Sequence, residues 1–192
     1  MNGILASPMT FLIDTVFGLY ILAVMLRFLL QLVEADFYNP VSQFLVKITH
    51  PPLRILRRFI PSFGRMDTAS LVLMFALQML GDYLVSYLQG GGQVAVGALA
   101  ALSFIQLVKL VFNVFIFAII IQALLSWINP DPYNPVYSLL SDLTEPVMRP
   151  CRRLLPPIGG LDLSPIIAII GLGFLMRLTL GLLEKLVTTF LF

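Results

Sequence analysis

Two groups of three arginines are the residues of this chain best suited to bind a charged ligand. Within each group the arginines are spaced i, i+3, i+4, so on a helix they share one face. A guanidinium group can hold a carboxylate or a phosphate through two parallel hydrogen bonds. We therefore expect them to bind anionic lipid headgroups or an acidic partner. The first group is Arg54, Arg57 and Arg58, and the second is Arg149, Arg152 and Arg153.

Two interpretations of these groups stay open. In the first, the arginines only set the orientation of the protein in the membrane and touch lipid headgroups, with about 1 kcal/mol per basic residue gained from anionic lipid. In the second, they form a duplicated docking surface for a cytoplasmic or membrane partner.

A second set of charges lies within apolar segments. Asp14 and Asp82 stand 95 residues before Lys109 and Arg177, so acids in one half of the chain correspond to bases in the other. An unpaired charge within a membrane span costs about 2.5 to 3.5 kcal/mol. These groups could form ion pairs that lock the two halves together, or each could extend to the headgroups, as Arg27 can also do.

No constellation for catalysis or metal binding is recognisable. Cys151 is the single cysteine and His50 the single histidine, which leaves no cluster resembling a zinc, haem or iron–sulfur site. Ser126 and Ser164 have no evident base, and no phosphate-binding glycine loop occurs. We expect neither enzymatic activity nor a cofactor.

The composition is that of a membrane protein. Of the 192 residues, 59% are hydrophobic and only 11% are charged, against roughly 25% charged in a soluble domain. A chain of this size cannot hide so much apolar surface, which excludes a water-soluble domain. The net charge of +2 is too small to suggest direct nucleic-acid binding.

Four apolar stretches are long enough to cross a bilayer, for which a helix needs roughly 20 apolar residues. The third stretch belongs to an apolar run, Val94–Ile128, that is too short to cross twice, so we expect one tilted span there. The first part of that run could project from the bilayer or lie at its surface. The expected spans are residues 11–33, 68–88, 106–128 and 163–190.

The chain contains an internal repeat at an offset of 95 residues. Residues 36–67 align without a gap on residues 131–162, with Asn39-Pro40 matching Asn134-Pro135 and all three arginines of each group in register. Each repeat is a span, a polar loop and a second span, so both repeats enter the membrane from the same side. We expect the first repeat to cover residues 1–93 and the second to cover residues 94–192.

The basic residues predict the orientation. Eight of the twelve lie in the two loops, and none lies in residues 1–10 or 89–93. By the positive-inside rule, both loops should be cytoplasmic in a multi-pass protein of the bacterial inner membrane. In addition to the arginine groups, the first loop carries Lys47 and Arg65.

Each loop is expected to form two short amphipathic helices that are broken at the prolines. Thr49 and Thr144 would be the N-caps of the second helices. Asp67 and Asp162 would cap the following spans, where the helix dipole favours negative charge.

The second loop resembles the YggT family of membrane proteins, also called YlmG in other lineages. The first repeat departs from the pattern at Arg65, where the second has Gly160, and at Ala69-Ser70, where it has Ser164-Pro165. The resemblance implies an integral membrane protein without catalytic residues, from a family linked to osmotic-stress tolerance, to nucleoid or envelope organisation and to cytochrome assembly in plastids. The matching segments are Pro130–Pro135, Thr144–Pro146, Arg149–Arg153, Pro156–Asp162 and Leu163–Ile166.

We therefore expect an all-helical protein with four spans that supports envelope homeostasis, osmotic-stress tolerance or membrane-complex assembly by binding lipid or a partner through its arginine loops. Such a small bundle could also form a homo-oligomer or join another membrane protein. The alternative is an oligomeric small-ion channel or transporter with Asp14, Asp82, Lys109 and Arg177 near its mouth.

Overall fold

The computed structural model describes residues 3–90, 95–128, 134–154 and 162–191, and these segments form six α-helices without a β-strand. The all-helical fold class is confirmed. The helices are α1 (Gly3–Leu32), α2 (Pro40–Leu56), α3 (Thr68–Leu88), α4 (Val96–Ile128), α5 (Pro135–Leu154) and α6 (Ser164–Leu191).

Four of these helices are long and apolar enough to cross a membrane. α3 has the bounds expected for the second span, and the other three contain most of the remaining expected spans. α4 is one continuous helix of 33 residues, about 50 Å long at 1.5 Å per residue. Because a hydrocarbon core is about 30 Å thick, this length fits one span that tilts or projects. The four spanning segments are Ser7–Leu32, Thr68–Leu88, Val96–Ser126 and Ser164–Thr189.

The expectation of two short helices in each loop is wrong, because α2 and α5 are each a single helix. Their N-caps are Asn39 and Asn134, whose side chains each accept a 2.9 Å hydrogen bond from the backbone N–H two residues later. A proline follows each asparagine and fits the first helical position, where no N–H partner is needed. Thr49 and Thr144 are therefore not N-caps but lie within the helices.

The structure accommodates Pro51 and Pro52 inside α2 with help from α1. A proline has no N–H to offer to the carbonyl four residues earlier. Pro52 thus leaves the carbonyl of Ile48 without its helical donor, and the hydroxyl of Tyr20 donates a 3.3 Å hydrogen bond to that oxygen. A side chain of the neighbouring helix replaces the missing donor, so α2 continues through the prolines.

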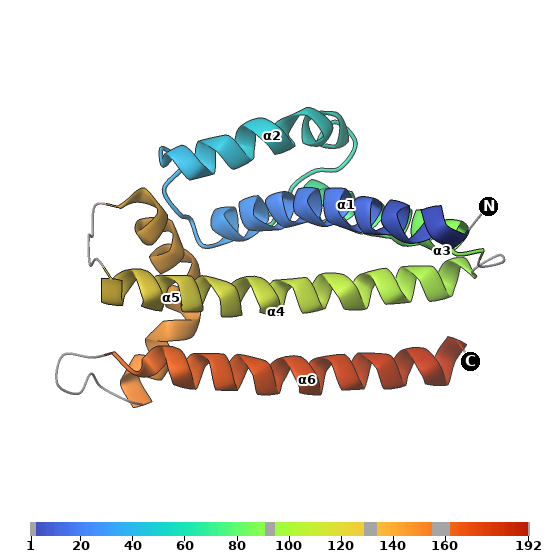
Figure 1. Cartoon of the computed structure of the whole chain (residues 1–192). Helices are drawn as coiled ribbons and strands as arrows, with labels where there is room; N and C mark the ends of the chain where they lie inside the picture. The colour runs from blue at the N-terminus through green and yellow to red at the C-terminus, as the bar shows by residue number, and fades with distance from the viewer. Residues whose placement is uncertain (1–2, 91–94, 129–133, 155–161, 192) are drawn as a thin grey trace.

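Each loop helix packs on the two spans of its own repeat: α2 on α1 and α3, and α5 on α4 and α6. α1 and α4 run in the same direction, while α6 lies beside α4 and runs back (Figure 1). The two repeats meet chiefly through α3 and α4, and α2 also contacts α5. The side-chain amide of Asn39 donates a 2.7 Å hydrogen bond to the carbonyl of Pro135. Both loop helices therefore begin at the same end of the bundle.

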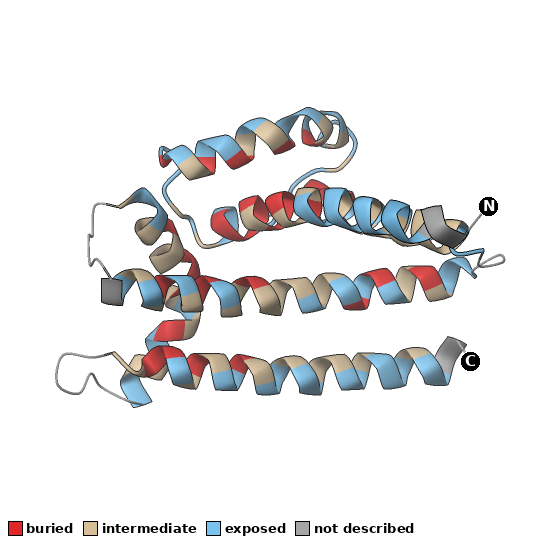
Figure 2. Ribbon diagram, viewed as in Figure 1, coloured by how far each residue is buried: buried red, intermediate tan, exposed pale blue. Residues whose placement is uncertain are grey.

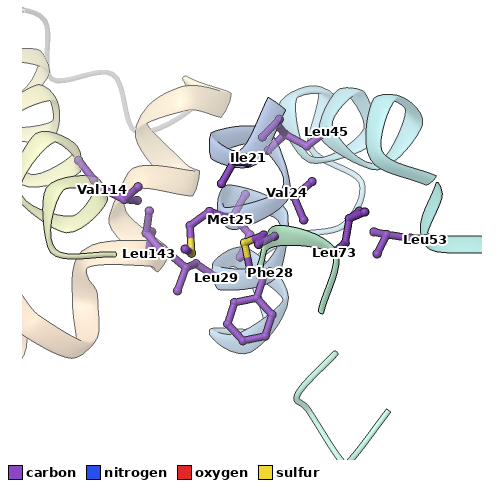
Figure 3. Packing of buried hydrophobic residues seen from close by; sticks show 14 of the residues in the cluster. Ile21, Val24, Met25, Phe28, Leu29, Leu45, Leu53, Leu73, Val114 and Leu143 are labelled. Atoms are coloured by element: carbon purple, nitrogen blue, oxygen red, sulfur yellow. The ribbon is translucent and has the colours of Figure 1, made fainter. Parts of the chain in front are cut away.

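The apolar core lies towards the loop end of α1. Ile21, Val24, Met25, Phe28 and Leu29 meet residues from four other helices there (Figure 3). Buried residues are concentrated in the second half of α1, whereas most of α6 and the first half of α1 are exposed (Figure 2). Exposed apolar surface of this extent marks a face that contacts lipid or another protein. The residues that other helices contribute to this cluster include Leu45, Leu53, Leu73, Val114 and Leu143.

Candidate functional site

An arginine of the first group binds an aspartate at the start of α3. Arg57 Nη2 lies 2.6 Å from Asp67 Oδ2, and the hydroxyl of Ser70 donates to the same oxygen at 2.6 Å. The Asp67 side chain is 2% exposed and that of Arg57 is 36% exposed. Burial by itself would raise the pKa of Asp67, but the hydrogen bonds from Arg57 and Ser70 and the positive charges of Arg57 and Arg27 lower it. This contact fastens the end of α2 to α3.

The second repeat forms the same contact with more exposed partners. Arg152 Nε lies 3.3 Å from Asp162 Oδ2, and Arg152 Nη1 lies 2.8 Å from Glu145 Oε2. Burial would raise the pKa of Asp162, but hydrogen bonds from Ser164 and Arg152 lower it. Arg57 and Arg152 are thus structural ion-pair partners within the chain.

The two aspartates lie where sequence placed them, directly before the next span. Asp162 caps α6 by accepting the backbone N–H of Ser164 at 2.9 Å. Asp67 occupies the N-cap position of α3, but its carboxylate makes no capping bond to the backbone. Its oxygens serve Arg57 and Ser70 instead, so its capping role is not formed.

A second duplicated contact joins the first span of each repeat to its loop helix. Arg27 is a buried residue with an exposed fraction of 8%, and its Nη1 donates to the hydroxyl of Thr49 at 2.8 Å. At the corresponding place, Thr144 Oγ1 lies 2.5 Å from Gln122 Oε1. Sequence reasoning missed this role of Arg27, although its match with Gln122 and that of the threonines could have indicated it.

The remaining four arginines of the two groups are exposed. Arg54, Arg58 and Arg153 make no side-chain hydrogen bond or ion pair with another described residue. Arg149 reaches only to 4.0 Å from Glu145. Large exposed apolar side chains lie beside them in sequence, at Ile55, Phe59 and Leu154. The part of each arginine group that is free to meet a ligand is therefore next to apolar surface.

The charges within the spans do not pair with one another in the described part of a single chain. Asp14, Lys109 and Arg177 are exposed, and no ion pair joins them or Asp82 among the described residues. Among these described residues, the expected ion pairs between acids of one repeat and bases of the other are therefore not formed.

Asp82 instead makes hydrogen bonds between the repeats. It accepts one from Ser103 of α4 at 2.7 Å and one from Gln78 at 3.1 Å, and Gln78 also donates to Gln106. These four side chains form a polar cluster between α3 and α4. The partners of Asp82 are therefore neutral, and the serine comes from a position that was not a candidate.

The fold and the repeated contacts define a multi-pass helical membrane protein built from an internal duplication. The sequence model of the CCB3/YggT family matches residues 6–88 and again residues 101–183. The chain belongs to this family, which confirms the resemblance read from its loops.

The relatives carry names that state no activity. An uncharacterized protein of Pseudomonas aeruginosa is 46% identical over 175 residues, covering 89% of this chain and 87% of the relative. The uncharacterized protein YggT of Escherichia coli is 34% identical over 187 residues, covering 95% and 93%. The uncharacterized protein ycf19 of Guillardia theta is 30% identical over 67 residues, which is 34% of this chain and 74% of the relative. No solved structure matches the chain.

Proposed function

We propose that the protein is a non-enzymatic component of the bacterial inner membrane whose loop helices α2 and α5 face the cytoplasm and bind anionic lipid headgroups. Through this binding it supports envelope homeostasis, including tolerance of osmotic stress, or the assembly of a membrane complex. The observation that carries the proposal is the set of exposed arginines, Arg54, Arg58, Arg149 and Arg153, which lack a close carboxylate partner among the described residues.

The chemistry of these helices suits an interface with lipid. Apolar side chains such as Ile55 and Phe59 can enter the boundary between headgroups and acyl chains. Each exposed arginine then gains about 1 kcal/mol from an anionic surface. Arg57 and Arg152 contribute differently, because their contacts with Asp67 and Asp162 hold the loop helices against the spans.

The orientation can be tested by labelling. In a Cys151→Ser background, Ser62→Cys and Gln89→Cys place one thiol in the first loop and one after α3. A membrane-impermeant maleimide added to intact cells should label the thiol at 89 and reach the thiol at 62 only after permeabilisation. Labelling of both from one side would overturn the topology.

The functional part is tested by replacing Arg54, Arg58, Arg149 and Arg153 with Gln at the chromosomal locus. Growth after hyperosmotic shock should fall to the level of a strain that lacks the protein, with unchanged amounts in the membrane. The matched control, Lys109→Gln with Arg177→Gln, also removes exposed positive charges but should grow as the wild type. Normal growth of the fourfold variant would contradict the proposal.

One observation favours the alternative of an oligomeric small-ion conduit. The cluster of Gln78, Asp82, Ser103 and Gln106 places polar groups between two spans, and such residues can mark ion pathways. Purified protein in liposomes would then carry K⁺ or Na⁺ and lose the flux on Asp82→Asn. No flux from the wild type would eliminate this alternative.

A further inference from the structure

A cavity of about 650 Å³ lies at the loop end of the first repeat. Its walls come from the last turns of α1, the segment that follows, the first half of α2, and residues just before α3. Leucine, valine, alanine and phenylalanine side chains supply the apolar part of the lining. The polar part consists chiefly of Arg27, Gln31, Glu34, Ser42, Arg57 and Asp67.

The charges of the lining leave one cation without an ion-pair partner. Glu34 pairs with Arg65 at 2.9 Å, and Asp67 pairs with Arg57. Arg27 has no carboxylate within ion-pair distance in the described chain. Within the described segments, its guanidinium donates to the hydroxyl of Thr49 and, at 3.5 Å, to the carbonyl of Val46. A buried cation of this kind is costly unless an anion joins it.

Two buried polar atoms in the lining residues also lack hydrogen-bond partners among the residues that the structure describes. They are Ser42 Oγ and Asp67 Oδ1. Buried polar groups are nearly always satisfied, so unpaired ones call for a missing partner. The serine hydroxyl can donate to an anion, whereas the carboxylate oxygen needs a donor. A ligand with an anionic group and a neighbouring N–H or O–H group meets both needs.

The second repeat can be compared with the first at the matching residues that the structure describes. The described residues at the matching place line a space of about 30 Å³, and five of them match cavity residues at the offset of 95. Gln122 stands in the place of Arg27, and Tyr137 in the place of Ser42. The second repeat thus lacks the cation that corresponds to Arg27, and the space lined by its described residues is smaller. Among the described residues, the large cavity with a buried arginine therefore belongs to the first repeat.

We propose that this cavity binds one phospholipid headgroup whose phosphodiester lies at Arg27 and whose own hydroxyl or ammonium group lies beside Asp67. Phosphatidylglycerol and phosphatidylethanolamine carry such a donor, and phosphatidylcholine does not. The apolar lining receives the first part of an acyl chain. This is a single internal site that does not depend on the exposed arginines of the loop helices.

The test uses the full-length protein in detergent, titrated with short-chain forms of these three lipids while its thermal unfolding is followed. Phosphatidylglycerol or phosphatidylethanolamine should bind the wild type at least tenfold more tightly than phosphatidylcholine does. Arg27→Gln and Ser42→Tyr each copy the second repeat and should fold, yet each should abolish that preference. Gln at position 27 keeps a partner for Thr49, as Gln122 does for Thr144.

Controls separate this site from the proposed surface function. Arg54→Gln with Arg58→Gln should leave the preference unchanged, as should Lys109→Gln. Equal binding of phosphatidylcholine, or an unchanged preference in both copied variants, would overturn the proposal. A titration with inorganic phosphate tests whether a free anion accounts for the binding. If it stabilised the protein as strongly as the lipids at equal concentration, the ligand would be a free anion and the lipid assignment would be wrong.

Discussion

Arg57 and Asp67 are joined by a contact of 2.6 Å that closes the first loop, and the second repeat forms the equivalent contact with a more exposed carboxylate. The Asp67 side chain is 2% exposed, whereas that of Asp162 is 38% exposed. Arg152 also has a second carboxylate partner, Glu145. Because the energetic weight of an ion pair depends on its burial, the two contacts should respond differently to mutation.

Arg57→Gln should destabilise the protein by about 2 to 3 kcal/mol, since it leaves a buried carboxylate without its cation while the partial exposure of Arg57 moderates the loss. Arg152→Gln should cost about 1 kcal/mol or less, because its partners are in contact with solvent. Thermal unfolding in detergent measures both. Equal losses would show that the difference in burial has no energetic consequence.

Thr49→Val should cost about 1 to 3 kcal/mol, because it removes the hydroxyl to which the buried Arg27 donates. Thr49→Ser keeps the hydroxyl and should lose much less. In the second repeat, Thr144→Val should be milder, since its partner Gln122 is neutral. Unfolding midpoints of the three variants check the order, and a Ser variant as unstable as the Val variant would indicate that the methyl group matters instead.

The number and approximate place of the candidate spans could be predicted from sequence, because they depend on composition. Long apolar runs predict helices in lipid, and α3 begins and ends where expected. The loops were harder to predict, because Pro51 and Pro52 favoured a break in the helix. The hydroxyl of Tyr20 makes that break unnecessary by bonding to the carbonyl of Ile48, which lies 28 residues after it in sequence.

For the candidate site, the sequence identified the arginines, but it did not show which of them form ion pairs within the chain and which are exposed. Arg54 and Arg57 are equivalent in the i, i+3, i+4 spacing. The packing of α2 on the spans leaves Arg54 exposed and brings Arg57 to Asp67. Aligning the two repeats at the offset of 95 gave more information about the candidate site than the pattern of charges alone. The alignment pairs Arg27 with Gln122 and Ser42 with Tyr137. These residues differ in type between the repeats, and they line the larger space in the first repeat and the smaller space in the second.

Acidic pH should lower the stability that the Arg57–Asp67 and Arg152–Asp162 ion pairs contribute to the fold. The pKa of Asp67 and that of Asp162 are lower in the folded protein than the ordinary value. These groups therefore stabilise the fold above about pH 4 and lose that contribution as the pH falls through the lowered values. Unfolding midpoints should drop between pH 5 and lower pH, and Asp67→Asn should flatten the dependence. A variant that kept the full wild-type slope would show that other groups cause it.

Asp142 should affect the pH dependence of stability in the opposite direction to Asp67 and Asp162. Burial raises its pKa, and the negative charge of Asp36 adds to the increase, although the backbone N–H of Asp36 partly opposes it. Its ionised form is thus disfavoured in the folded state at neutral pH. Asp142→Asn should raise the unfolding midpoint at pH 7, and the gain should shrink as the pH approaches 4. A lower midpoint at pH 7 would contradict this interpretation.

The binding of anionic lipid by the four exposed arginines is tested most directly by counting lipids. Wild-type protein and the Arg54, Arg58, Arg149 and Arg153→Gln variant are placed in bilayer discs of phosphatidylcholine and phosphatidylglycerol, and lipid that remains bound after mild extraction is identified by mass spectrometry. The wild type should retain several phosphatidylglycerol molecules in a salt-sensitive manner, and the variant should retain at most the one assigned to the cavity. Equal, salt-insensitive retention by both proteins would contradict the account.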